Sequence, residues 1–198
     1  MDLQHVNVKF LVSDPASVDL EPLIPVFHRW IQEQVFEELL LDIADYRHVH
    51  DGPGIVLIGH QADYSLDNTD GRLGVRYNRK APLDGGNEDR LKQAASSALR
   101  ACQRLEAEGV LAEKIRFNGR DVEFFINDRL LAPNREEVRR LLDPEFKAFF
   151  GTLFCGSDYG MSYDTDARRL LRVSVQASKH FSVTELLKNL EGSTGLDH

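Results

Sequence analysis

Residues 55–80 read IVLIGHQADYSLDNTDGRLGVRYNRK, and this stretch decides the fold. Two runs of alternating apolar and polar residues flank the turn-rich piece DNTDG, a pattern typical of two half-buried strands joined by a turn. Closing the chain within that turn pairs Tyr64 with Val75 and His60 with Arg79, and it gathers the apolar side chains on one face. A slip of one residue would scatter them over both faces. The stretch therefore predicts a long antiparallel hairpin with one core-facing side.

The same two periodicities predict the other elements. Alternation indicates strands at 6–12, 38–46 and 171–177, and helical spacing indicates helices at 21–34, 87–108, 134–154 and 182–192. Pro144 is expected to break or kink the third helix, and residues 158–169 are read as a loop. Asn118-Gly119 lies between two alternating runs and predicts a second hairpin, because a type I′ turn needs two positive φ angles.

The order of these elements predicts one α+β domain over residues 1–198. We expect two layers, a mainly antiparallel sheet covered by helices. A hairpin followed by a helix recurs at 54–108 and 114–155, which indicates an internal ββα duplication. Residues 193–198 are expected to form a frayed tail.

Composition limits the classes of function. The chain has 198 residues, of which 42% are apolar and 28% charged, as in ordinary globular proteins. The formal net charge of −8 argues against binding to nucleic acid, and the short apolar runs argue against a membrane span. Its two cysteines, Cys102 and Cys155, form no CxxC pattern, which favours a reducing cytoplasm. Cys102 lies on the apolar stripe of the helix at 87–108 and is expected in the core.

Five polar residues at or near the ends of the predicted long hairpin are the candidates for ligand binding. They are Asp45, His48, His60, Tyr64 and Arg79. Histidine is suited to acid–base work near neutral pH, and a guanidinium suits a small anionic ligand. The alternative interpretation of His60 is a partly buried histidine that hydrogen-bonds a neighbour. Arg72, Arg76, Arg79 and Lys80 form a basic stripe, for which cross-strand pairing with acids such as Asp63 is the competing interpretation.

Motifs for metal, cofactor or covalent catalysis are missing from the sequence. Neither HExxH nor a Cys/His finger spacing occurs, and DGPG at 51–54 does not match a dinucleotide-binding loop. His48 and His50 could share a strand face, yet a metal site would need a third ligand, which Asp42 or Asp45 could supply. We therefore predict no metal, no cofactor and no assigned catalytic residue.

The stretches DIADYRHVHDGPGIVLIGHQADYSLD, GVRYNRK and FINDRLLAPN resemble a family of uncharacterised bacterial proteins of about this length. The resemblance runs over most of the chain. It implies a bacterial, cytosolic protein and carries no established activity, so no catalytic residue is transferred from it.

Two functions follow as hypotheses. The first is a non-catalytic binding or assembly protein, a homodimer, with the apolar surface formed by Phe146, Phe149, Phe150 and Leu153 as its interface. The second is a small-molecule-binding protein or enzyme whose pocket lies at the end of the hairpin at 54–80. His60 or His48 would then act as acid–base group, and Arg79 would hold an anion.

Overall fold

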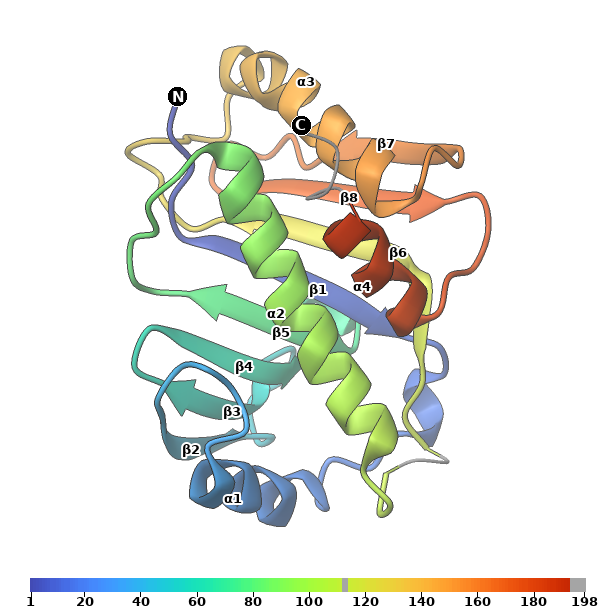
Figure 1. Ribbon diagram of the computed structural model, residues 1–198. Helices are drawn as coiled ribbons and strands as arrows, with labels where there is room; N and C mark the ends of the chain where they lie inside the picture. Colours follow the sequence, from blue (N-terminus) through green and yellow to red (C-terminus); the bar gives the residue numbers. More distant parts are fainter. Residues whose placement is uncertain (112–113, 193–198) are drawn as a thin grey trace.

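The computed structural model of the protein describes residues 1–111 and 114–192, and its centre is an antiparallel sheet of eight strands (Figure 1). The strands lie in the order β2-β3-β4-β5-β1-β6-β8-β7. Their bounds are β1 Val6–Val12, β2 Leu40–Tyr46, β3 Gly54–Gly59, β4 Ala62–Asp67, β5 Gly74–Arg79, β6 Phe117–Ile126, β7 Tyr159–Tyr163 and β8 Leu171–Ala177. The tail predicted at 193–198 lies outside the described residues.

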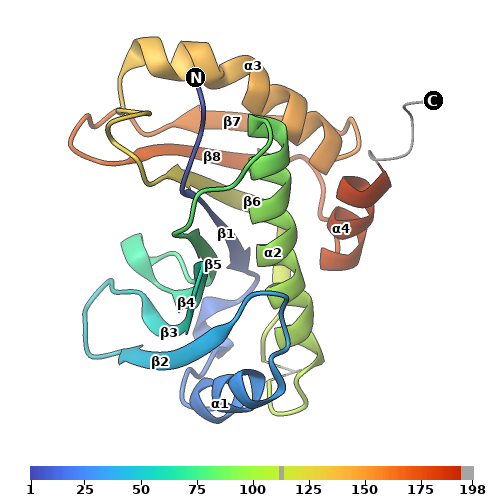
Figure 2. The same ribbon diagram turned by 60° about the vertical axis from the view of Figure 1, so that its left-hand side comes forward.

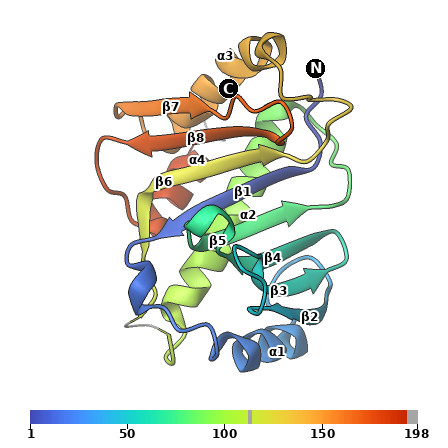
Figure 3. The same ribbon diagram turned by 180° about the vertical axis from the view of Figure 1, so that it is seen from behind.

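Helices form the second layer. They are α1 Leu23–Glu33, α2 Asn87–Ala107, α3 Glu136–Leu153 and α4 Val183–Gly192, with short 3₁₀ turns η1 at Pro15–Ser17 and η2 at Thr69–Gly71. Figure 2 shows α2 and α4 on the same side of the sheet, and Figure 3 shows the strands in front of α2 from behind. This arrangement is the predicted two-layer α+β fold. We call the side turned away from α2 the open face.

The long helix α2 packs closely on the middle of the sheet because small residues line its inner side. Its buried stripe contains Leu91, Ala94, Ala95, Ala98, Cys102 and Leu105, as the sequence predicts. The stripe contacts β1 and β5, and alanine side chains allow the helix axis to come near the strands. Cys102 is buried there, whereas Cys155 is exposed.

The prediction that residues 55–67 form one strand is wrong, because the chain reverses at His60 and Gln61. β3 and β4 pair antiparallel on either side of this turn, with Ile58 opposite Asp63. The backbone of the turn is held by neighbouring chain segments: the His60 N–H donates to the Leu39 carbonyl at 2.8 Å. Alternation of apolar residues continues across the turn, so the pattern alone did not reveal it.

The pairing of β4 with β5 differs from the predicted register by two residues. Tyr64 lies opposite Tyr77, and Arg79 lies opposite Ala62 instead of His60. The 3₁₀ turn η2 lengthens the connection, and Asp70 within it takes a positive φ of 61°. A shift of two keeps every side chain on its face, so Tyr64 and Tyr77 are buried on the helix side as expected.

The hairpin predicted at Asn118-Gly119 is also wrong, because both residues belong to the single strand β6. The strand pairs with β1 on one side, where the register jumps between the pairs Phe10–Val122 and Val12–Phe117. Gly119 has a φ of 55° in this irregular part, and a Cβ there would collide with the Phe181 carbonyl. Of the two positive φ angles that the predicted turn requires, only that of Gly119 is present, and it serves a bulge. Residues 114–155 thus contain one strand before their helix, whereas 54–108 contain three.

Two predictions about the last third of the chain need correction. α3 continues through Pro144 as one helix, and residues read as a loop contain β7, which pairs with β8 at the edge of the sheet. The helix predicted at 182–192 is α4, and Ser182 and Glu185 form a capping box at its start: the Ser182 N–H donates to the Glu185 carboxylate at 2.7 Å, and the Glu185 N–H donates to the Ser182 hydroxyl at 3.2 Å.

The phenylalanines of α3 form core, which removes the basis for the predicted apolar interface. Phe146 and Phe150 are fully buried, and Phe149 is 4% exposed. Their rings surround Phe124 of β6, with centroid distances of 5.3 Å for Phe149 and 5.4 Å for Phe150. Such edge-to-face contacts stabilise a core beyond the area that they bury. These side chains therefore hold α3 on the sheet.

No helix in residues 1–111 or 114–192 is long and apolar enough to cross a membrane.

Truncating the phenylalanine cluster tests this packing. We expect Phe150→Ala to lower the free energy of unfolding by about 3–5 kcal/mol, because it empties a fully enclosed position. Urea denaturation measures the change. Leu141→Ala on the same helix is the control, since Leu141 is 55% exposed, and its effect should stay within about 0.5 kcal/mol. Equal small effects for both variants would contradict the assignment of Phe150 to the core.

Candidate functional site

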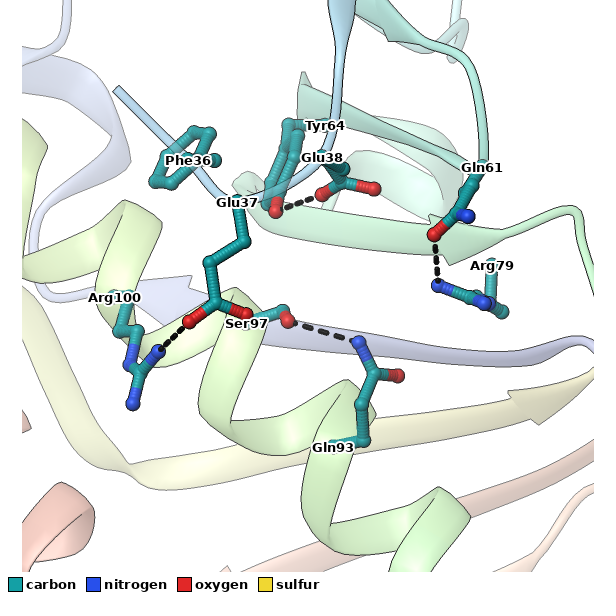
Figure 4. A pocket seen from close by; sticks show the side chains of 9 residues that line it. All are labelled: Phe36, Glu37, Glu38, Gln61, Tyr64, Arg79, Gln93, Ser97 and Arg100. Carbon is teal, nitrogen blue, oxygen red and sulfur yellow. Dashed lines mark hydrogen bonds and ion pairs between the residues drawn. The ribbon is translucent and has the colours of Figure 1, made fainter. Parts of the chain in front are cut away.

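A pocket of about 140 Å³ lies where the turn between β3 and β4, the end of β5 and one side of α2 meet (Figure 4). We call it the Glu38–Tyr64 pocket. The sheet supplies Gln61, Tyr64 and Arg79 to its lining, and the segment before β2 supplies Glu38. Residues from three separate parts of the sequence therefore converge on one small space.

The segment that carries Glu38 is fixed by Gln34, which ends α1 in the left-handed conformation with a φ of 48°. The Gln34 side chain imitates a strand partner for Leu40: its oxygen accepts from the Leu40 N–H, and its amide donates to the Leu40 carbonyl, both at 3.0 Å. Phe36 then stacks on Tyr64 with a centroid distance of 4.5 Å. These contacts hold Glu38 over the Tyr64 hydroxyl.

Glu38 and Tyr64 form a hydrogen-bonded pair, in which the phenol donates to Oε1 of the carboxylate. Burial raises the pKa of Glu38, while the hydrogen bond from Tyr64 and the charge of Arg79 oppose that rise. Burial, followed by the charge of Glu38, raises the pKa of Tyr64. The pair therefore holds its proton on Tyr64, and the protonated form of Glu38 is favoured more than for an exposed carboxyl.

The second oxygen of Glu38 has no hydrogen-bond partner in the described residues, although it is buried. It faces the side of the pocket where Gln61 and Arg79 lie (Figure 4). A buried carboxyl oxygen without a partner is costly, because desolvation of that atom is uncompensated. A ligand atom placed in the pocket would supply the missing hydrogen bond.

Arg79 is held by uncharged groups. Its guanidinium donates to the carbonyls of Ala81 at 2.8 Å and Pro82 at 3.2 Å, and to the Gln61 side chain at 3.4 Å. Among the described residues, no carboxylate lies within ion-pair distance of it. Arg79 thus keeps its positive charge uncompensated by a direct partner at the wall of the pocket.

The third wall is the polar side of α2. Gln93 donates to the Tyr77 hydroxyl at 2.9 Å and to the Ser97 hydroxyl at 3.1 Å. Arg100, one further turn along, lies 3.9 Å from Glu37. The spacing of these residues places them on one side of the helix.

The structure brings Tyr64 and Arg79 together and leaves the other three candidates outside this pocket. His60 is exposed at the turn beside Gln61. Asp45 and His48 lie at the opposite end of β3, because Asp45 pairs with Ile55 at the start of that strand. There Arg47 hydrogen-bonds Asp45 and lowers its pKa to about 2.

His48 and His50 are both exposed. Within residues 1–111 and 114–192, no group of three or more His, Cys, Asp or Glu side chains is arranged to hold a metal ion.

Glu38, Gln61, Gln93 and Ser97 were missed by the sequence analysis. Each is a common polar residue beside an apolar run, so neither motif nor periodicity separates it from a surface residue. The two glutamates before the apolar run at 39–41 are the one local signal, since that run leads into strand β2.

Comparisons with known proteins give no relatives: no family model, no curated protein and no solved structure matches this chain.

The raised pKa of Glu38 predicts a pH-dependent effect of Glu38→Gln on stability. The pKa of a glutamate side chain is 4.5 in the unfolded chain, and burial raises it for Glu38 in the folded protein. The contribution of such a carboxyl to the free energy of unfolding is fully present below pH 4.5 and is lost as the pH rises through the pKa of the folded state. Glutamine cannot ionise, so the variant should be more stable than the wild type at about pH 8, with a difference that shrinks towards about pH 4.

Urea denaturation over that range measures the difference. Glu37→Gln is the control, because the neighbouring Glu37 side chain is 97% exposed. A Glu38→Gln variant that is less stable than the wild type at about pH 8 would contradict the proposed burial cost.

Proposed function

We propose that this protein binds a small carboxylate in the Glu38–Tyr64 pocket. The observation that carries the proposal is the buried, unpartnered oxygen of Glu38 beside the uncompensated guanidinium of Arg79. A protonated Glu38 donates a hydrogen bond to one ligand oxygen, and Arg79 binds the negative charge. The volume of about 140 Å³ restricts the ligand to a few heavy atoms.

The charge balance of the pocket supports an anion. With Glu38 neutral, the remaining charged side chains of the lining are Glu37, Arg79 and Arg100, which leaves one positive charge. An ammonium ligand would require an ionised Glu38, whose formation burial disfavours. A small carboxylate therefore matches both the donor and the charge that the pocket offers.

Acetate is the probe, and its affinity is measured by NMR titration at about pH 6 and about pH 8. We expect tighter binding at the lower pH, because the protonated form of Glu38 is the donor. Glu38→Gln keeps a donor that does not titrate, so its acetate binding should become independent of pH.

Arg79→Gln removes the anchoring charge and should weaken acetate binding by about tenfold or more. Arg140→Gln is the matched control, because Arg140 is exposed on α3 and pairs with Glu136. Absence of saturable acetate binding to the wild type would refute the proposal, as would an Arg79→Gln variant with unchanged affinity.

Self-assembly through β2 is the second candidate function, and it replaces the interface first expected on α3. β2 is an edge strand of the sheet. Leu39 and Leu41 at its start are 55% and 49% exposed, Tyr46 at its end is 42% exposed, and Val49 in the turn that follows is 43% exposed. Exposed apolar side chains on an edge strand suit pairing with the same strand of a second copy.

Light scattering tests this candidate. We expect a homodimer that Leu41→Asp converts to monomer, because a charge within the contact is desolvated without a partner. Leu141→Asp, at an equally exposed position on α3, should leave the dimer intact. A wild type that is monomeric at high concentration would refute the candidate.

A further inference from the structure

A second pocket, of about 260 Å³, lies on the open face near the connection between β7 and β8. Its lining is dominated by guanidinium groups, and we call it the five-arginine pocket. The five are Arg76, Arg129, Arg168, Arg169 and Arg172. They come from β5, from the segments after β6 and β7, and from β8, so the fold gathers residues almost 100 positions apart in the sequence.

The pocket is positively charged within an acidic protein. Its carboxylates are Asp70 and Asp164, which leaves three more positive than negative charges in the lining. Asp166, just outside, pairs with Arg168 at 2.9 Å. Two more carboxylates lie behind the pocket, Asp67 at 3.7 Å from Arg76 and Glu123 at 3.9 Å from Arg172. Lys9 and Arg72 pair with these two carboxylates, so the local excess is two positive charges. The whole chain carries −8, so this excess is a local feature.

Two of the guanidiniums are fixed by shared carboxylates. Asp70 accepts from Arg172 at 2.6 Å and from Arg169 at 3.2 Å. Asp164 lies 3.4 Å from Arg169 and 3.7 Å from Arg172. This bridge sets the positions of Arg169 and Arg172 before any ligand arrives, which reduces the ordering cost of binding.

Phe125 of β6 fixes two guanidiniums by a different interaction. Arg76 lies over its ring at 4.5 Å from the centroid, and Arg172 lies at 5.8 Å. In the strand order β5-β1-β6-β8, Arg76 on β5 and Arg172 on β8 lie on either side of β6. The two arginines therefore approach the Phe125 ring from opposite sides. The ring is thus occupied by cations, and stacking of a nucleobase on it would displace them.

Arg129 and Arg168 remain as the adaptable groups. Both are exposed, and Arg129 donates to the Arg168 carbonyl at 2.6 Å, which ties their two segments together. Their long side chains can close on an anion that the fixed arginines receive.

We propose that the five-arginine pocket binds a small phosphate-bearing anion of the size of a diphosphate. Guanidiniums match phosphate oxygens in paired hydrogen bonds, and several of them are needed to balance more than one negative charge. The small extent of the pocket, about 260 Å³, and the net charge of −8 favour a small anion over a nucleic-acid strand, whose repeated phosphates the acidic surface repels.

Isothermal titration calorimetry with inorganic pyrophosphate tests the site at about 0.15 M salt. We expect saturable binding at one site per chain. The double substitution Arg129→Gln with Arg168→Gln should weaken it by about tenfold or more. The control double substitution, Arg135→Gln with Arg140→Gln at the start of α3, should leave it unchanged, as should Arg79→Gln in the other pocket.

Asp70→Asn makes the test sharper, because asparagine tolerates the positive φ of 61° at this position. The change removes one negative charge from the pocket, while the side-chain oxygen of asparagine can still accept from Arg172 and Arg169 and keep them in place. Pyrophosphate binding should therefore tighten by about tenfold. Wild type without saturable binding, or tightening absent in Asp70→Asn, would overturn the proposal. An oligouridylate of about twelve nucleotides that competes with pyrophosphate and binds more tightly than pyrophosphate would also overturn it.

Discussion

The open face depends on the ion pair between Lys9 and Asp67, at 2.6 Å, in the middle of the sheet. Lys9 lies on the central strand β1, and both side chains are almost fully buried, 1% and 2% exposed. Burial lowers the pKa of Lys9, and the contact with Asp67 opposes that change. A buried pair of this kind adds little net stability, but the loss of one partner is costly because the other charge stays buried. The pair therefore fixes which segment covers the middle of the open face.

The connection between β4 and β5 is the segment that covers the middle of the open face. Asp67 also accepts from the Thr69 N–H at 3.1 Å and from its hydroxyl at 3.0 Å, and Lys9 donates to the Thr69 carbonyl at 3.3 Å. The 3₁₀ turn η2 is thereby fastened over the sheet with Asp70 directed at Arg169 and Arg172. Charged contacts thus extend from the central strand to β8, and the bridge within the five-arginine pocket is their outer end.

Alternation along β4 and β5 was enough to predict which side chains face the helices, but it did not predict where the chain turns. For β3 the predicted face was wrong, because Ile55 and Leu57, and not Val56 and Ile58, lie on the same side as Tyr64. A register error of two residues leaves Tyr64 and Tyr77 on the helix side, because side chains alternate with a period of two. The turn at His60 and Gln61 was missed since it carries neither Asn-Gly nor proline. Gly119 has one of the two positive φ angles expected at Asn118-Gly119, but it lies within a strand, because a bulge and a type I′ turn both use the left-handed conformation.

The same alternation explains why one strand supplies both pockets. Arg76 and Arg79 of β5 are three positions apart and lie on opposite faces, so the basic stripe of the sequence is divided by the sheet. Arg79 joins Tyr64 on the helix side, where Glu38 and α2 complete the pocket. Arg76 joins Phe125 on the open face. Tyr64 and Arg79 could be predicted as neighbours from one hairpin, whereas Glu38 could not, because its position depends on how α1 and β2 pack against a strand distant in sequence.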